Sequence, residues 1–162
     1  MGTRYFGERI KRNEDPRLLT GRGMFVDDVR LPGLLHGAVL RSPHAHARIA
    51  RVETSRARAL SGVVAVYTRG DLPATLQAPL PKLIPHPALI HHKTQYALAP
   101  EKVRYVGEPV AFVVAESRYL AEDAIELIDV EYEPLPAVVD LTHAAQPDAP
   151  RVHEDMGTNV CA

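Results

Sequence analysis

Histidines are the residues of this sequence whose spacing comes closest to metal chemistry. His44 and His46 lie two positions apart, so on a strand they would share a face, and His36 could approach from a neighbouring strand. Three histidines are enough to hold Zn²⁺. However, Pro43 interrupts this stretch and no carboxylate stands at ligand-like spacing, so hydrogen-bonded turn histidines are the simpler interpretation. The adjacent His91-His92 is weaker still, because neighbouring side chains of an extended chain point apart.

Phosphate-binding and nucleophilic motifs are incomplete. Gly21-Arg22-Gly23 lacks the third glycine of a dinucleotide loop, because Val26 stands in its place, and no Gly-Lys-Ser/Thr sequence is present. Ser42 has a histidine two positions on but lies outside any Gly-x-Ser-x-Gly elbow, so we expect it to cap the connection between two strands. The paired acids Asp27-Asp28 and Glu122-Asp123 suit a turn and the first turn of a helix. We therefore assign no catalytic, cofactor-binding or metal-binding residue.

The single cysteine excludes thiolate-based redox centres built from this chain alone. Cys161 lies beside the C-terminus, where we expect the chain to fray, and this position disfavours a nucleophilic role. One thiol forms no internal disulfide, and an iron–sulfur cluster needs about four thiolates. Any redox centre that works with this chain must therefore come from other sequence.

The elements that position these residues follow the order strand–strand–helix–strand, and this order occurs twice. A short helix should begin after Thr54 or Ser55 and end at Gly62. Ser117 should cap the main helix, whose apolar face is formed by Leu120, Ala121, Ala124, Ile125 and Ile128. Alternating or β-branched residues predict strands over 34–41, 47–53, 63–68, 103–106, 110–115 and 128–132, and a short helical piece over 141–145. The pattern predicts an α+β (mixed α/β) fold with more strand than helix.

Two segments do not fit this pattern. Residues 71–100 hold six of the 14 prolines and show no clear period. About 30 residues without regular structure are long for a compact domain, so we expect this segment to pack on something or to cap a site. Polar residues dominate the N-terminus, so we divide the chain into an extended arm (1–17), a domain (18–150) and an exit segment (151–162).

Length and composition describe one compact domain. The chain has 162 residues, of which 46% are hydrophobic and 24% charged, and a chain of this size buries roughly 70% of its unfolded surface. No apolar run approaches the ~20 residues that cross a bilayer, and the N-terminus lacks the apolar core of a secretory signal. We expect a cytoplasmic protein without membrane contact.

The net charge of −1 hides an asymmetry between the two parts of the chain. Up to Leu60 there are 12 Lys/Arg against 6 Asp/Glu, and from Ser61 onward there are 7 against 14. The arginines of the first part form no basic tract and are not interleaved with aromatic residues. We therefore favour a solvated or subunit-facing surface over a nucleic-acid partner.

Four stretches, in this order, resemble one family. They are Leu19-Thr20-Gly21-Arg22-Gly23 through Asp27-Asp28 to Leu31-Pro32-Gly33; Arg41-Ser42-Pro43-His44-Ala45-His46-Ala47-Arg48-Ile49; Ala59-Leu60-Ser61-Gly62-Val63-Val64-Ala65-Val66; and Gly107-Glu108-Pro109-Val110-Ala111 through Ala121-Glu122-Asp123-Ala124 to Val130-Glu131-Tyr132-Glu133-Pro134-Leu135-Pro136. Together they are similar to the N-terminal α/β-hammerhead domain of the molybdenum hydroxylase large subunit, found in xanthine dehydrogenase, aldehyde oxidase and aerobic carbon monoxide dehydrogenase.

The resemblance implies a mixed sheet with two main helices and a protruding strand motif. In that family the molybdenum, the pterin-binding loops and the glutamate base lie downstream, so no catalytic residue carries over. Gly157-Thr158-Asn159-Val160 resembles the family's exit toward the molybdenum domain. No cofactor is expected on this chain alone; the molybdopterin cofactor, iron–sulfur clusters and FAD are expected in the full complex.

The implied function is a structural and subunit-contact role within a molybdopterin-dependent hydroxylase. The whole enzyme would oxidise aldehydes, N-heterocycles or CO with water as the oxygen source. The implied partners are a molybdopterin-binding chain or domain, with iron–sulfur and flavin subunits. We expect residues 71–100 and the turn over residues 41–46 to contact them.

Two alternatives remain open at this stage. The first is a stand-alone binding or carrier module, because hammerhead motifs recur in biotinyl and lipoyl carriers. A carrier needs an exposed lysine flanked by Met or Asp, and neither residue flanks Lys82, Lys93 or Lys102. The second is an independent hydrolase or metalloenzyme, which would rest only on His36, His44 and His46.

Overall fold

The computed structural model describes residue 7, residues 9–82 and residues 86–162, and the chain divides into two units, residues 1–34 and 35–162. The first unit contains helix α1 (Asp15–Leu19), which has a proline in its first turn, and the 3₁₀ turn η1 (Val26–Asp28). None of its described residues is buried. Helix α1 crosses residue 17, the predicted end of an extended arm; the division into arm, domain and exit segment stays a prediction.

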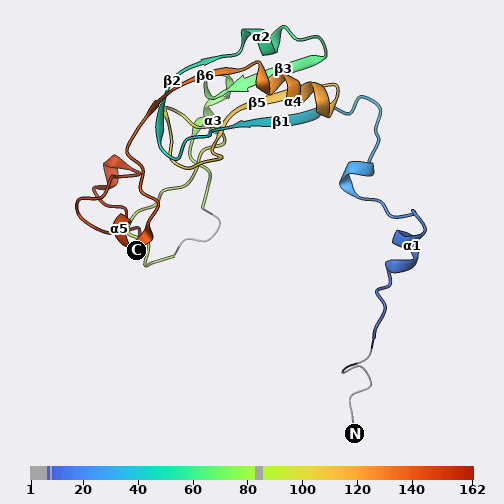
Figure 1. The fold of residues 1–162 in the computed structure, drawn as a ribbon, viewed down its shortest axis with the longest axis horizontal. Coiled ribbons are helices and arrows are strands. Elements are labelled where there is room, and N and C mark those ends of the chain that lie inside the picture. Colours follow the sequence, from blue (N-terminus) through green and yellow to red (C-terminus); the bar gives the residue numbers. More distant parts are fainter. Residues whose placement is uncertain (1–6, 8, 83–85) are drawn as a thin grey trace. The chain divides into compact units, whose positions relative to one another are not determined.

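The second unit contains two three-stranded sheets (Figure 1). One has the order β1-β5-β3, formed by β1 (His36–Arg41), β5 (Pro109–Ala115) and β3 (Val63–Thr68). The other has the order β4-β2-β6, formed by β4 (Lys102–Val103), β2 (Ala47–Glu53) and β6 (Asp129–Pro134). Every pairing between these described strands is antiparallel. The α+β prediction is confirmed, with two antiparallel sheets where the sequence suggested one mixed sheet.

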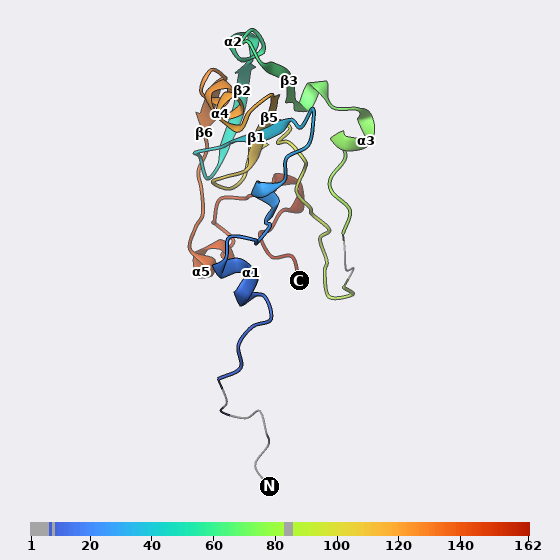
Figure 2. The ribbon, with the colours of Figure 1, turned by 90° about the vertical axis from the view of Figure 1, so that its right-hand side faces the viewer.

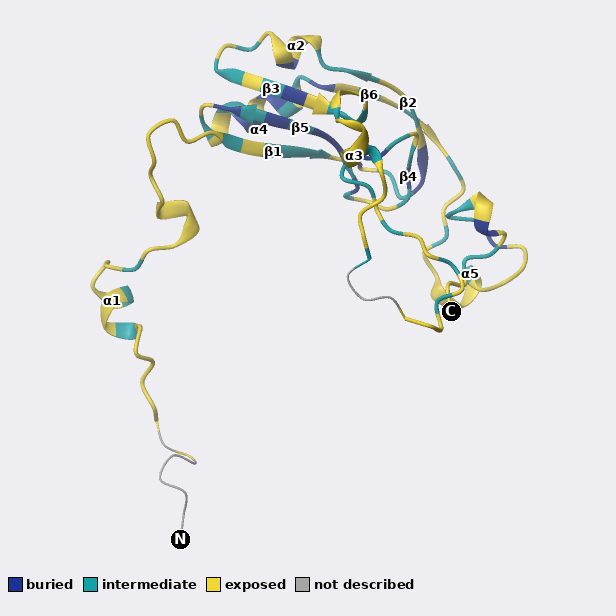
Figure 3. Cartoon of the chain, turned by 180° about the vertical axis from the view of Figure 1, so that it is seen from behind, coloured by how far each residue is buried: buried dark blue, intermediate teal, exposed yellow. Residues whose placement is uncertain are grey.

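Helices α2 (Ser55–Arg58) and α4 (Arg118–Glu126) cover one face of the sheet β1-β5-β3. Alanines at positions 57, 121 and 124 make this contact, which lets the helices approach the strands closely. Figure 3 shows the buried residues gathered on these strands and helices. The largest side chains that are less than 2% exposed among the described residues are valines: Val66, Val103, Val110 and Val113. The core is therefore built mainly from alanine and valine, with Leu98, Ile128 and Met156 as its larger members, and it contributes less hydrophobic stabilisation than a core of leucine and phenylalanine would.

Local signals set the positions of these elements. The Ser117 hydroxyl accepts the amide hydrogen of Leu120 at 3.2 Å and begins α4, as predicted. Thr54 precedes α2, as predicted, but the predicted helix end at Gly62 is wrong, because α2 ends at Arg58 and Ala59 is its C-cap. Gly62, with a φ of +87°, lies in the turn before β3, in a left-handed conformation that favours glycine. A short helix, α5 (Leu141–Ala144), begins at Asp140. The longest described helix, α4, has nine residues, and no described helix is long and apolar enough to span a membrane.

The predicted strand over 103–106 is wrong, because only Lys102 and Val103 pair with β2. The amide of Arg104 instead donates to the carboxylate of Glu108 at 2.5 Å, and the amide of Glu108 donates to the carbonyl of Tyr105 at 3.3 Å. These bonds turn the chain away from the sheet after Val103. A side chain therefore ends this strand.

The proline-rich segment packs onto the second unit, as expected. It contains helix α3 (Ala74–Gln77), which Figure 2 shows on the opposite side of the sheet β1-β5-β3 from α4. Leu98 and Ala99 are buried, and the amide of Ala99 donates to the carbonyl of Pro109 at 2.7 Å. The segment thus returns to the start of β5 before β4 begins.

A substitution at Gly37 tests the packing on the face of the sheet β1-β5-β3 that lies opposite α4. A Cβ atom at this position would lie 2.5 Å from Cζ of Phe112, so Gly37→Ala must displace the ring. We expect a loss of about 1–3 kcal/mol in the free energy of unfolding, measured by denaturant titration. Gly70→Ala is the control, because its nearest atom would be 3.8 Å away. Equal stability of the two variants would contradict the packing described.

Candidate functional site

The turn between β1 and β2 is cross-linked to the turn before β5. The amide of Ser42 donates to the carbonyl of Glu108 at 2.9 Å, and the amide of Gly107 donates to the carbonyl of Ser42 at 2.8 Å. Arg41 adds a bond from its guanidinium to the carbonyl of Gly107 at 2.9 Å. The Ser42 hydroxyl accepts the amide hydrogen of His44 at 3.0 Å. Ser42 therefore caps the strand connection, as predicted, and is only 2% exposed.

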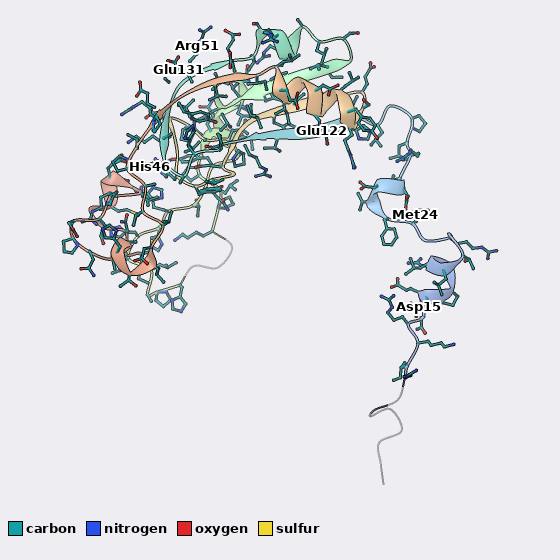
Figure 4. All side chains as sticks on the ribbon, in the orientation of Figure 1. Asp15, Met24, His46, Arg51, Glu122 and Glu131 are labelled. Carbon is teal, nitrogen blue, oxygen red and sulfur yellow. The ribbon has the colours of Figure 1, made fainter. Side chains whose placement is uncertain are left out.

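The two histidines of this turn have structural partners. The His44 ring lies 4.8 Å from the Tyr132 ring, centroid to centroid, at an interplanar angle of 54°. Nδ1 of His46 lies 2.8 Å from the carbonyl oxygen of Pro136. A carbonyl only accepts, so Nδ1 carries the hydrogen of this bond. Figure 4 shows His46 where the chain leaves the sheet for the C-terminal residues. Its Nε2 is buried and has no partner among the described residues.

The three-histidine metal site considered from the sequence does not form. His36 pairs with Ala115 at the start of β1, whereas the turn that carries His44 and His46 follows the other end of that strand. Within the part of the chain that the structure describes, no three His, Cys, Asp or Glu residues gather as metal ligands do. Cys161, the exposed thiol, is not loose: its carbonyl accepts the amide of Ile90 at 2.8 Å.

Glu108 is the one carboxylate among the buried polar residues of the described chain, at 3% exposed. Burial raises the pKa of this carboxyl group, and the bond from the Arg104 amide together with the Arg104 charge opposes that rise. Its position behind the Ser42 turn, and not a catalytic arrangement, accounts for its burial. The sequence shows it only as the middle residue of Gly107-Glu108-Pro109, so local pattern could not reveal it.

A cavity of about 640 Å³, lined by both charged and apolar side chains, lies beside this turn, between the proline-rich segment and the C-terminal residues. Arg104 and Lys93 contribute positive charge, and burial together with these two charges lowers the pKa of His153. Lys93 forms an ion pair with Asp155, and Lys102 forms one with Glu154. These pairs hold residues 154–155 against the rest of the second unit. The sequence analysis missed this cavity, because its walls come from three separate stretches.

Comparison with known proteins assigns the family. The sequence model of the aldehyde oxidase and xanthine dehydrogenase a/b hammerhead domain matches residues 20–136. The chain belongs to this hammerhead family. The hammerhead prediction is therefore confirmed, and the cross-linked turn and both sheets lie within the matched residues.

Relatives carry this hammerhead domain within much longer chains. The carbon monoxide dehydrogenase large chain of Afipia carboxidovorans is 49% identical over 150 residues, which cover 93% of this chain and 18% of the relative. A solved Cu,Mo-CO dehydrogenase superposes with a TM-score of 0.78 at 49% identity, over 93% of this chain and 18% of its own. Quinoline 2-oxidoreductase from Pseudomonas putida 86 superposes at 0.81 with 43% identity, over 94% and 19%. The chain thus spans about one fifth of the length of these relatives.

Removing the Ser42 hydroxyl should loosen the turn. Ser42→Ala leaves the amide of His44 without its acceptor in a buried position, and we expect a loss of about 1–2 kcal/mol in the free energy of unfolding. Thermal and urea unfolding measure the loss. Ser61→Ala, at an exposed position, serves as the matched control. An equal loss in both variants would show that the Ser42 hydroxyl stabilises the fold no more than an exposed serine does.

Replacing Glu108 should change the pH dependence of stability. A raised pKa means that the folded hammerhead domain keeps a proton which the unfolded chain has released, so wild-type stability falls as pH rises above the ordinary value of 4.5. Glu108→Gln lacks this proton exchange and keeps an oxygen for the Arg104 amide. We expect the variant to gain stability relative to wild type between about pH 4 and pH 7. Urea unfolding of both proteins across this range measures the difference in their free energies of unfolding. If this difference does not change with pH, burial does not raise the pKa of Glu108.

Proposed function

We propose that this chain is the hammerhead portion of a molybdopterin-dependent hydroxylase large subunit, with a structural and subunit-contact role. The observation that carries the proposal is the 49% identity to a carbon monoxide dehydrogenase large chain over 93% of this chain. The relatives include enzymes named for carbon monoxide, nicotine and quinoline. We extend this to a whole enzyme that oxidises aldehydes, N-heterocycles or CO, with water as the oxygen source.

The redox groups of that enzyme are assigned to other polypeptide. This chain has one cysteine, against the about four thiolates that an iron–sulfur cluster needs. Its described residues also offer no cluster of metal ligands. The donor set therefore does not fit an iron–sulfur cluster. We propose that the molybdopterin cofactor, the iron–sulfur clusters and FAD are held by the remaining domains and subunits. No catalytic step is assigned to a residue of this chain.

The contact role is assigned to the turn over residues 41–46 and to the proline-rich segment. The turn is rigid because the Ser42 bonds tie it to Glu108. In the proline-rich segment, the amide of Leu80 donates to the carbonyl of Gln95 at 2.8 Å. A surface turn that is already held by internal bonds loses little conformational entropy on association, which suits it to a permanent subunit contact. A cytoplasmic location and the lack of nucleic-acid or membrane partners stay predictions.

A stand-alone binding or carrier module is the alternative. The contacts made by Lys82, Lys93 and Lys102 argue against it. A carrier lysine must be free to take its acyl group and swing. Lys93 and Lys102 are bound to Asp155 and Glu154, and Lys82 contacts the ring of His92. Intact mass after expression with a biotin or lipoate ligase separates the two functions, because only a carrier gains the modification.

Co-expression tests the proposed function. We expect the chain to co-elute in gel filtration with the molybdopterin-binding part of the large subunit, expressed as a separate chain, in a fixed stoichiometry. The assembled complex should then place ¹⁸O from labelled water into an aldehyde, an N-heterocycle or CO. A monodisperse chain that never associates with the molybdopterin-binding chain would contradict the proposal.

A further inference from the structure

An apolar groove crosses the face of the sheet β1-β5-β3 that α4 leaves open. Val39, Phe112 and Tyr67 form one row across its three strands, because Val39 and Tyr67 both pair with Phe112. Helix α3 and the segment before β4 wall the groove, which encloses about 480 Å³. An antiparallel sheet that faces water on one side normally carries polar residues there. This face carries an aliphatic and two aromatic side chains instead.

The lining offers almost no charge to an occupant. Asp71 is its only charged residue, and the Asp71 carboxylate is already bound. It accepts two bonds from the Arg58 guanidinium at 3.0 Å, and bonds from the amide and the hydroxyl of Thr68 at 2.7 Å. A charged peptide or a nucleic acid would therefore lose water in the groove and gain no partner. The chemistry selects an uncharged, apolar occupant.

The distribution of large side chains supports a surface that another polypeptide covers. Fully buried side chains in the described part are no larger than valine, whereas Tyr67 is 39% exposed and Leu76 is 51% exposed at the groove. Contiguous apolar patches rimmed by polar residues mark interaction sites. The bulky residues are thus placed where a partner would bury them.

We infer that this groove is the docking site for an uncharged, apolar segment of the molybdopterin-binding part of the large subunit. The inference rests on the proposed function. It adds which surface of this chain contacts the molybdopterin-binding part and which chemistry that contact has. The matched large chains hold this domain in about one fifth of their length, so the remaining four fifths supply the polypeptide beside it. The groove is a different surface from the turn over residues 41–46.

A charge placed in the groove tests the inference. Tyr67→Glu puts a carboxylate where the apolar segment would pack, and Tyr119→Glu puts the same group on α4, where Tyr119 is 78% exposed. The 162-residue chain and each variant are titrated with the molybdopterin-binding chain by gel filtration and calorimetry. We expect Tyr67→Glu to weaken association at least about tenfold, and Tyr119→Glu to bind as wild type. Tyr67 also packs beside Phe112, so thermal unfolding of the variant alone must show a cooperative transition above the temperature of the titration, and Tyr67→Phe, which keeps the apolar surface, should bind as wild type.

The outcomes separate this inference from the proposed function. If wild type associates and Tyr67→Glu associates equally well, the groove is not the docking site, while the proposed function stands. If wild type does not associate, the proposed function fails and the inference fails with it. A wild-type dimer that Tyr67→Glu abolishes, or a small apolar molecule retained in native mass spectrometry, would also overturn the inference, because the occupant would be a second copy or a ligand.

Discussion

The fold depends on one point, where the amide and carbonyl of Ser42 bond to Glu108 and Gly107. The chain passes between the two sheets twice near this point: from β1 to β2 through Ser42, and from β4 to β5 through residues 104–108. The two passages are bonded to each other, so neither sheet can shift without the other. The buried carboxylate of Glu108 tightens the second passage by holding the Arg104 amide. Two small sheets thereby behave as one body.

This arrangement explains how a core of small residues suffices for folding but not for complete burial. Alanines at positions 57, 121 and 124 bring α2 and α4 close to the strands, and the larger side chains on that face, such as Leu40 and Leu120, pack around these alanines and are only partly buried. On the opposite face, Phe112 and Tyr67 lie across the same strands. The same three strands therefore supply both the small core and the apolar groove.

Sequence reasoning succeeded where local forces decide the structure. The β-branched run of β3 and the alternation of β2 predicted those strands to the residue, and Ser117 marked the start of α4 because capping is local. It failed where a bond outside the regular strand and helix patterns decides the structure. The strand after Val103 stops because the Glu108 side chain, four residues on from Arg104, accepts the Arg104 amide, and the backbone of Cys161 is bonded to Ile90 of the proline-rich segment. Neither bond leaves a periodic signal in the sequence.

In the candidate site, too, features set by neighbouring residues were predictable from the sequence and features set by distant contacts were not. The cap formed by Ser42 was predictable from a short turn motif, whereas Glu108 and Nδ1 of His46 meet chain segments about 65 and 90 residues away. Chemistry at those distances needs a fold before it can be recognised. The resemblance to a family supplied that fold in advance, because four separated motifs in a fixed order constrain the arrangement more than any one of them. The apolar groove had no motif of its own, since its row of Val39, Phe112 and Tyr67 exists only through strand register. A surface that is created by the register of paired strands therefore becomes visible only in the structure and not in the sequence.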